Sequence, residues 1–379
     1  MSASEASIDP RLGAGLRILH VIPSFAGGGA ERQLSLLAHA LSRIGVEVHL
    51  AHVHDGPNLA LAQRSGAVLH KLGVRRNHDP RTLVRLVALI RALRPDVVQT
   101  WLLHADVFGG TAARICGAPW LLSERCSGPM YEHGLKFRLR KALGRGARAV
   151  VANSERGVEY WRDAGFAGTT RVIRNIVTVP AQVERQVHST ADVDLILGIG
   201  RLSDQKNWFA FLSALERVFA ARSGARAVVL GEGPLRDALQ AAIDASPHLK
   251  NRVQLVGYVE DIATWLRTAN LLVSLSLYEG TPNAVLEAMA ALCPVVVSDI
   301  PEHRELVDAE TALFSPVNQP AVAAEAIERV LLDPDGAEQR ARMARQRVES
   351  WSAQAAADQY VQLYRALSGA PLSQLMSAS

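Results

Sequence analysis

The chain has 379 residues, of which 49% are apolar and 21% charged, which favours a soluble protein with more than one domain. The net charge is only +4, but residues 1–185 carry 25 Lys and Arg against 14 Asp and Glu, and the remainder is acidic. A basic half indicates an anionic partner, and since no zinc-finger or helix-turn-helix pattern accompanies it, nucleic acid is not expected.

Cysteine usage and the N-terminal sequence indicate a reducing compartment. The three cysteines, Cys116, Cys126 and Cys293, lack metal-ligand spacing and are odd in number, which argues against a disulfide framework. Residues 1–15 contain acids and a proline but no apolar stretch, so they do not form a secretory signal. No run reaches the ~20 apolar residues of a membrane helix. We therefore expect a cytoplasmic protein whose first fifteen residues are disordered.

The first predicted strand, residues 16–23, is followed by a glycine-rich turn and a helical pattern that ends near Arg43. A glycine turn between a strand and a helix brings backbone N–H groups close to a phosphate, so Gly28 and Gly29 are predicted to contact one. A dinucleotide-binding turn would have glycine where Arg32 stands, which weakens the case for a nicotinamide cofactor.

Strands and helices alternate through the rest of the first half. The predicted strands are residues 46–52, 67–70, 96–101, 120–125 and 149–154, with an amphipathic helix at 81–93. This alternation predicts a parallel, doubly wound sheet. Ligands of such sheets lie outside the carboxyl ends of strands, and His104 and Asp106 follow one strand at this end. A single histidine is more often structural, so its type alone leaves both roles open.

The segment 134–148 is strongly basic. It contains six cations and no acid: Lys136, Arg138, Arg140, Lys141, Arg145 and Arg148. On a helix, Leu135 and Leu139 would share an apolar face that could pack on the sheet. Two interpretations stay open. The helix is either a solvated basic surface, or its first four cations dock on anionic lipid head groups so that a lipid-linked acceptor can reach the site.

The second half begins with a predicted linker, residues 178–193, which lacks periodicity. A strand at 194–202 then leads into a loop that carries Arg201 and Lys206, before a helix. Two cations in one short loop can neutralise a diphosphate, because Arg offers a planar fork of donors and Lys a point charge.

Alternation continues, with further strands predicted at residues 225–235, 253–259 and 294–299. Tyr258 lies where the second of these strands ends. Asp192 and Asp194 form a D-x-D pattern of the kind that can hold a metal ion. This pair precedes a strand, at the wrong end of the sheet, so we predict no metal site there.

A mostly apolar strand, residues 269–277, leads into a helix with a polar start. Thr281 suits the N-cap and Pro282 the first helical position. Three backbone N–H groups would then lack helical partners and, with the helix dipole, would attract a phosphate: those of Asn283, Ala284 and Val285. Glu279 precedes this turn and Glu287 follows it among apolar residues. An unpaired carboxylate is costly to bury there, so we expect ligand hydroxyls to pair with Glu287.

The seven residues between Glu279 and Glu287 resemble the E-x7-E signature of retaining glycosyltransferases of family 4, which have the GT-B fold. Other motifs are similar to that family as well: Gly-Gly-Gly-Ala-Glu at 27–31, Trp-Leu-Leu-His-Ala-Asp at 101–106 and Gly-Arg-Leu-x-x-x-Lys-Asn at 200–207. The resemblance covers nearly the whole chain.

This resemblance implies an α/β chain of GT-B class, with two Rossmann-like, doubly wound domains facing one another across a cleft. The acceptor-side domain would comprise residues 16–180 and the nucleotide-sugar domain residues 190–350. The segment 351–379 would contain a helix that crosses back to the first domain, followed by a tail.

The resemblance also implies the roles of individual residues. The catalytic set would be Glu279, His104, Arg201 and Lys206. The donor-binding set would be Gly28, Gly29, Tyr258, Asn283, Ala284, Val285 and Glu287. The two cations would neutralise the leaving diphosphate, Glu279 would orient sugar hydroxyls, Glu287 would bind the ribose, and His104 would contact the sugar. No metal or other cofactor is expected.

The resulting hypothesis is a metal-independent hexosyl- or N-acetylhexosaminyltransferase that uses a UDP- or GDP-linked sugar. Its acceptor would be a glycan or a lipid-linked molecule, in cell-surface polysaccharide or glycoconjugate synthesis, at the inner face of the cell membrane. Two alternatives remain: a nucleotide-sugar epimerase of the same fold, and a non-catalytic sugar-nucleotide-binding protein. Donor turnover without acceptor would identify an epimerase, and the presence of Glu279 and Lys206 argues against the second alternative.

Overall fold

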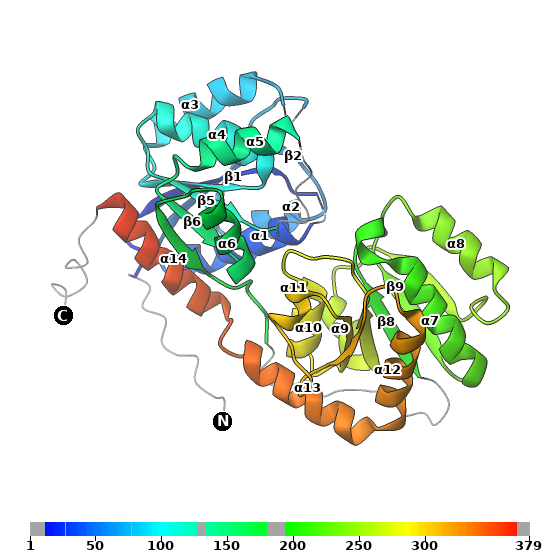
Figure 1. The fold of residues 1–379 in the computed structure, drawn as a ribbon. Coiled ribbons are helices and arrows are strands. Elements are labelled where there is room, and N and C mark those ends of the chain that lie inside the picture. Colours follow the sequence, from blue (N-terminus) through cyan, green and yellow to red (C-terminus); the bar gives the residue numbers. More distant parts are fainter. Residues whose placement is uncertain (1–11, 27, 77, 127–133, 180–193, 370–379) are drawn as a thin grey trace. The chain divides into compact units, whose positions relative to one another are not determined.

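The computed structural model describes residues 12–26, 28–76, 78–126, 134–179 and 194–369 (Figure 1). The chain forms two compact units. Unit 1 comprises Met1–Ile176 and Trp351–Ser379, and unit 2 comprises Val177–Ser350. The predicted linker, apart from Thr178 and Val179, lies outside the described residues, as does the predicted tail beyond residue 369.

Unit 1 is built on a parallel sheet of seven strands in the order β3-β2-β1-β4-β5-β6-β7. The strands are β1 (Arg17–Ser24), β2 (Glu47–His54), β3 (Val68–Lys71), β4 (Val97–Trp101), β5 (Trp120–Glu124), β6 (Ala149–Ala152) and β7 (Thr169–Val172). The helices are α1 (Gly29–Arg43), α2 (Leu59–Gln63), α3 (Arg81–Leu93), α4 (Leu103–Ile115), α5 (Leu135–Gly144), α6 (Glu155–Asp163) and the C-terminal α14 (Ala353–Ser368).

Helices cover both faces of this sheet, with α1 and α14 on one face and α3, α4 and α5 on the other (Figure 1). Successive residues of one strand therefore pack in different hydrophobic cores. Leu121 packs with α1 and α14, and Leu122 packs with α3 and α4 on the other face of the sheet. Side chains on a strand alternate between faces, so a central strand buried on both reads as a continuous apolar run.

The C-terminal helix α14 completes the core of unit 1. Tyr360 and Tyr364 are buried there, and the Tyr364 hydroxyl donates to the Gln99 side chain. Arg365 donates to the Leu12 carbonyl at 2.9 Å. The expected disorder of residues 1–15 is wrong for residues 12–15: the Gly13 N–H donates to the Ile44 carbonyl at 2.8 Å, because Leu12 packs against the core and draws this turn in.

Unit 2 has a parallel sheet of six strands in the order β10-β9-β8-β11-β12-β13. The strands are β8 (Leu195–Ile199), β9 (Arg226–Leu230), β10 (Val253–Gly257), β11 (Leu271–Ser274), β12 (Val295–Ser298) and β13 (Leu313–Ser315). The helical elements are η2 (Asp204–Lys206), α7 (Trp208–Ala221), α8 (Arg236–Ala245), α9 (Ile262–Thr268), α10 (Asn283–Ala290), α11 (Pro301–Arg304), α12 (Pro320–Leu332) and α13 (Pro334–Val348).

Both sheets are doubly wound, as the alternation of strands and helices predicted. Strand order reverses between β1 and β4 in unit 1 and between β8 and β11 in unit 2. Loops that leave two such neighbouring strands in opposite directions open a crevice at the carboxyl end of the sheet, where ligands of Rossmann-like folds bind. Each unit is therefore a Rossmann-like domain whose described strands reverse their order at one place, where a ligand can bind at the carboxyl end of the sheet.

Candidate active site

In unit 2 the loops after β8 and β11 meet at the reversal of strand order. The backbone N–H of Leu277 donates to the Gln205 carbonyl at 2.8 Å, and the Gln205 side chain donates to the Tyr278 carbonyl at 3.0 Å. These bonds tie the cation-bearing loop to the glutamate-bearing loop. The predicted Lys206 and Glu279 are thereby brought together, although 73 positions separate them in sequence.

Lys206 and Glu279 form an ion pair at 2.5 Å, from Nζ to Oε1. The Glu279 side chain is 6% exposed and that of Lys206 17% exposed, so both are largely withdrawn from water. Ser276 donates its hydroxyl to the same Oε1 at 2.6 Å, and Gln205 approaches Oε2 at 3.4 Å. This carboxylate is held by donors from both loops.

Electrostatics keep Glu279 ionised. Burial raises the pKa of this carboxyl, but the charge of Lys206 and hydrogen bonds from Lys206 and Ser276 outweigh burial, so the pKa lies below its usual value. A buried carboxylate that remains charged at neutral pH is suited to accept hydrogen bonds from sugar hydroxyls.

Arg201 lies in the same loop as Lys206, and its side chain is exposed. Its carbonyl accepts a hydrogen bond from the Trp208 indole at 2.9 Å, which ties the loop to the first turn of α7. A backbone anchored in this way leaves the guanidinium available to an anion at the carboxyl end of β8.

The start of α10 differs from the prediction. Pro282, and not Thr281, occupies the N-cap, and the Thr281 hydroxyl is buried without a hydrogen-bond partner. The Val285 N–H donates to the Pro282 carbonyl at 3.0 Å, so it is not a free donor as predicted. The helix starts one residue later than expected, and its first turn closes on Pro282. Asn283 and Ala284 form the N-terminus of α10.

Two predicted donor-binding residues lie on separate elements of unit 2. Glu287 is half-buried on α10, just over one turn from Asn283. Tyr258 follows β10 and is 47% exposed, but β9 separates β10 from β8 in the strand order. An exposed ring at the carboxyl end of the sheet is available to a planar ligand.

In unit 1, Gly28, Gly29 and His104 all follow strands at the reversal of order. Gly28 is the N-cap of α1, and a side chain there would collide with the Glu31 carboxylate. Glu31 was not predicted. It is 7% exposed, and burial raises the pKa of its carboxyl to about 7. Glycine at position 28 therefore leaves room for the Glu31 carboxylate in the first turn of α1. The spacing of the glycines did not predict this contact.

His104 lies in the first turn of α4 and is half-buried; burial lowers the pKa of its ring. The preceding Leu102 has φ 71° and ψ 161°, a region that residues with side chains rarely adopt. Backbone strain of this kind is concentrated at functional sites. Its presence at the β4–α4 turn supports a functional position for His104.

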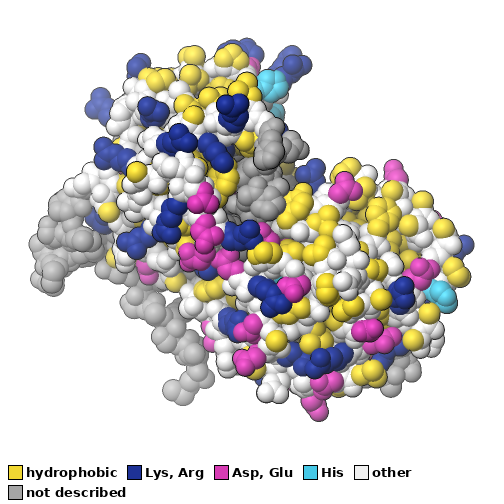
Figure 2. Space-filling view, in the orientation of Figure 1, with side chains coloured by type: hydrophobic (Ala, Val, Ile, Leu, Met, Phe, Trp, Pro, Cys, Tyr) yellow, Lys and Arg dark blue, Asp and Glu magenta, His cyan; other side chains and the backbone are white. Residues whose placement is uncertain are grey.

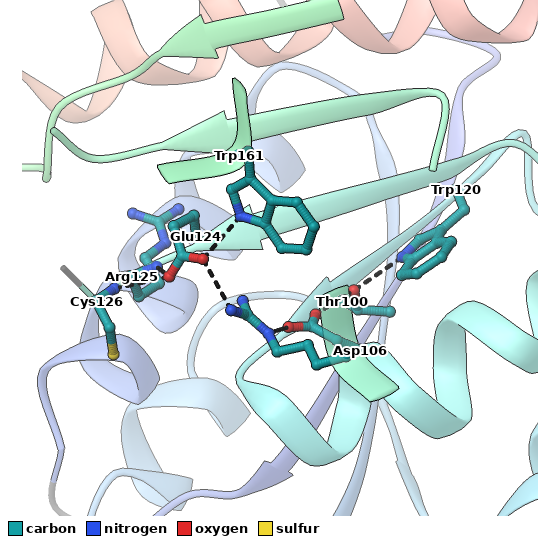
Figure 3. Close-up of polar contacts among 8 residues, drawn as sticks. Thr100, Asp106, Trp120, Glu124, Arg125, Cys126 and Trp161 are labelled. Atoms are coloured by element: carbon teal, nitrogen blue, oxygen red, sulfur yellow. Dashed lines mark hydrogen bonds and ion pairs between the residues drawn. The ribbon is translucent and has the colours of Figure 1, made fainter. Parts of the chain in front are cut away.

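A buried ionic network lies behind this turn (Figure 3). The guanidinium of Arg140 donates to Asp106 at 2.6 Å and to Glu124 at 2.9 Å, and each of the three side chains is at most 2% exposed. Asp106 also accepts from the Thr100 hydroxyl at 2.6 Å. Glu124 accepts from the Trp161 indole at 2.8 Å. The network joins β4, β5, α4, α5 and α6.

This network corrects the prediction that Arg140 faces anionic lipid. Arg140 and Gly144 form the inward face of α5, whereas Leu135 and Leu139, whose apolar face could have packed on the sheet, are 81% and 46% exposed. The inward face was misjudged because the apolar residues were assumed to face the core. Two buried acids instead draw Arg140 in, and the leucines turn outward.

Other parts of the predicted basic surface remain at the surface of unit 1. Lys136 and Arg138 are exposed on α5, and Lys141 lies over the Tyr160 ring at 4.5 Å. Figure 2 shows Lys and Arg side chains spread over unit 1, the upper part of the view.

Among the described helices, none is long and apolar enough to cross a bilayer. Within the same residues, no three His, Cys, Asp or Glu side chains are grouped as metal ligands.

Family models match the two units in turn. The model described as "Glycosyltransferase Family 4" matches residues 27–179, and "Glycosyl transferases group 1" matches residues 194–333. An uncharacterized glycosyltransferase of Methanocaldococcus jannaschii is 32% identical over 130 residues, which are 34% of this chain and 32% of that protein. The UDP-Gal:alpha-D-GlcNAc-diphosphoundecaprenol alpha-1,3-galactosyltransferase of Escherichia coli is 26% identical over 268 residues, 61% of this chain and 65% of that protein.

The matched segments therefore span less than two thirds of these relatives. Among solved structures, HepE of Anabaena in complex with UDP and glucose has a TM-score of 0.81 and 20% identity. The match covers 93% of this chain and all of HepE. At this identity the likeness concerns the fold.

Proposed function

Because the chain belongs to glycosyltransferase family 4 and has the GT-B fold, we propose that it transfers a sugar from a nucleoside-diphosphate sugar to a glycan or lipid-linked acceptor. The donor is UDP- or GDP-linked and the sugar a hexose or N-acetylhexosamine, used in cell-surface polysaccharide or glycoconjugate synthesis. One observation carries this proposal: the Lys206–Glu279 pair lies where strand order reverses in unit 2, with Arg201 in the same loop.

Each part of this group meets one demand of the reaction. Negative charge grows on the diphosphate as it leaves, and Arg201 and Lys206 are preorganised cations that stabilise it. Glu279 accepts hydrogen bonds from the sugar. Since Lys206 and Ser276 already hold its carboxylate, Glu279 acts as an acceptor and not as a nucleophile, which favours retention by attack of the acceptor on the face that the diphosphate leaves.

The first test removes each cation. Lys206→Ala and Arg201→Ala should lower kcat far more than the melting temperature, because the lost charge acts on the transition state. Lys250→Ala, at an exposed lysine of unit 2, serves as the control. Near-normal turnover by Lys206→Ala and Arg201→Ala would refute the diphosphate assignment.

A panel of nucleotide sugars identifies the donor. A ligand present at a hundred times its dissociation constant should stabilise the protein by about 2.7 kcal/mol, which a thermal-shift assay detects. Each stabilising donor is then incubated without acceptor. Conversion to an epimer would identify an epimerase, whereas transfer that requires an added acceptor supports a transferase.

We also propose that divalent metal is dispensable, because two cations and the N-terminus of α10 already complement the leaving group. Activity should persist after removal of metal with a chelator. Complete loss that is restored by magnesium or manganese would overturn this part of the proposal.

Attachment to the inner face of the cell membrane belongs to the same proposal. The outer face of α5 presents Leu135 and Leu139 together with Lys136 and Arg138, so it combines apolar insertion with positive charge. Each cation near an anionic surface contributes about 1 kcal/mol. This face suits reversible docking beside a lipid-linked acceptor in the cytoplasm.

Flotation with liposomes of rising anionic content tests the docking. Replacing Lys136 and Arg138 by alanine should weaken binding most at low salt, and replacing Leu135 and Leu139 by serine should weaken it at all salt concentrations. Arg140 stays unchanged, because it is part of the fold. Wild-type binding by both double variants would exclude α5 as the contact.

A further inference from the structure

A fully buried histidine lies behind the candidate active site of unit 2. His303, on the short helix α11, is 0% exposed. Its Nδ1 is 2.8 Å from the carbonyl oxygen of Ser298 and 3.2 Å from the hydroxyl of the same serine. No prediction from the sequence singled it out, since neither a motif nor a charge pattern marks it.

These contacts fix the protonation of the ring. A carbonyl oxygen can only accept, so Nδ1 carries the proton and Nε2 carries a lone pair. Burial lowers the pKa of His303 to about 4, although the charge of Glu279 acts in the opposite direction. The ring is therefore neutral at physiological pH.

A directed series of hydrogen bonds connects the ring to the carboxylate. The Ser298 hydroxyl, which can accept from Nδ1, donates to the Ser276 carbonyl at 2.6 Å. The Ser276 hydroxyl donates to Glu279 Oε1 at 2.6 Å. His303, Ser276 and Ser298 are each at most 1% exposed, so water does not compete for these bonds.

The two serines lie where neighbouring strands end. Ser298 is the last residue of β12, and Ser276 follows β11 and precedes Glu279 by three residues. The bond from Ser298 to Ser276 therefore sets the path of the backbone that leads to Glu279. A shift of Ser298 would reach Glu279 through one hydrogen bond and three residues of backbone.

We propose that His303 is a positioning residue for Glu279: its neutral Nδ1–H form anchors Ser298, and through Ser298 and Ser276 it fixes the carboxylate against Lys206. This inference rests on the role of Glu279 in the proposed function. A histidine that merely filled the core would be replaceable by leucine, which occupies a similar volume without a hydrogen bond. Positioning instead requires the donor at Nδ1.

Crystal structures of two variants test the positioning without any substrate. In His303→Leu the Glu279 carboxylate should lose its place between Lys206 and Ser276. In His303→Asn, whose amide N–H can replace Nδ1–H, the carboxylate should keep that place. An unmoved Glu279 in His303→Leu would overturn the proposal, even if the variant were less stable.

Kinetics add a readout that a structural role would not produce. With the donor selected from the nucleotide-sugar panel, His303→Leu should lower kcat on the order of 10–100-fold, the usual effect of a small displacement of a catalytic group. Affinity for UDP or GDP alone, which lacks the sugar, should change little. His303→Asn should recover most of the loss, and His248→Leu, at an exposed histidine of unit 2, is the control.

A double-mutant cycle tests whether these residues act through one connected series of hydrogen bonds or independently of one another. Because the Ser298 hydroxyl carries the link to the Ser276 carbonyl, Ser298→Ala and His303→Leu should be strongly non-additive in kcat, and additive losses would overturn the series. Glu279→Gln distinguishes the two proposals. If Glu279→Gln keeps turnover, the proposed role of Glu279 fails; if it loses turnover but His303→Leu does not, only the positioning role of His303 fails.

Discussion

The guanidinium of Arg140 forms ion pairs with two buried acids, Asp106 and Glu124, and its removal would break both pairs. Breaking a buried ion pair by removing one partner costs about 3–5 kcal/mol. Arg140→Ala should therefore lower the free energy of unfolding by about that amount in urea denaturation. Arg138→Ala, two positions away and exposed, should stay within about 0.5 kcal/mol of the wild type. Equal effects of the two substitutions would contradict the burial of Arg140.

Glu31 makes stability depend on pH. The pKa of its carboxyl is about 7 in the folded protein and near 4.5 when unfolded, so its contribution to stability falls as pH rises from 4.5 to 7. Glu31→Gln should stabilise the folded protein at pH 8 by at most about 3.5 kcal/mol, since one pKa unit is about 1.4 kcal/mol, and should thereby raise its melting temperature. The same substitution should give no gain at pH 4. A gain that is equal at both pH values would show that burial of the charge is not its cause.

At the scale of single residues, the spacing of residues within a motif predicted which side chains belong to the candidate site. Contacts between segments that are distant in sequence could not be predicted. Lys206 and Glu279 were predicted because each belongs to a local pattern, and they meet as an ion pair. Arg140 was assigned to the surface because its acidic partners lie 34 and 16 positions away, on other elements. Most arginines are exposed, so the residue type favoured the surface. Arg140 is buried instead because it pairs with two acids of other elements.

Helix α4 approaches β5 closely at Gly110, where an added Cβ would collide with the Trp120 ring. Alanine improves helix propensity by about 1 kcal/mol, but overpacking a core costs about 1–3 kcal/mol. Gly110→Ala should therefore destabilise unit 1 on balance, as measured by chemical denaturation. A more stable variant would mean that α4 can move away from the sheet without loss.

Most elements could be predicted because their signals are local. Residues 294–299 read as a strand, and β12 is Val295–Ser298; residues 81–93 read as a helix, and α3 is Arg81–Leu93. The orientation of α5 and the cap of α10 could not be predicted. The first depends on buried acids of other elements, and the second on a turn that closes at Pro282.

At the scale of the whole molecule, unit 1 depends on the end of the chain. Deleting residues 351–379 would remove Tyr360, Tyr364 and their neighbours from its core. Backbone amides of β1 and β4 should then lose protection in hydrogen exchange, while those of β8 and β11 keep theirs. Retained protection in β1 and β4 would show that α14 is dispensable.

The discontinuous make-up of unit 1 sets an order of events at the ribosome. The strands of this unit emerge first, but α14 is synthesised only after all of unit 2. At about 5–20 residues per second, the nascent first sheet waits for roughly 10–40 s with one face covered by α1 but not yet by α14. Unit 2, which is continuous, can fold during that interval. The domain that is translated second is thus the first able to close its core, and the synthesis of α14 is the step that lets the first domain mature.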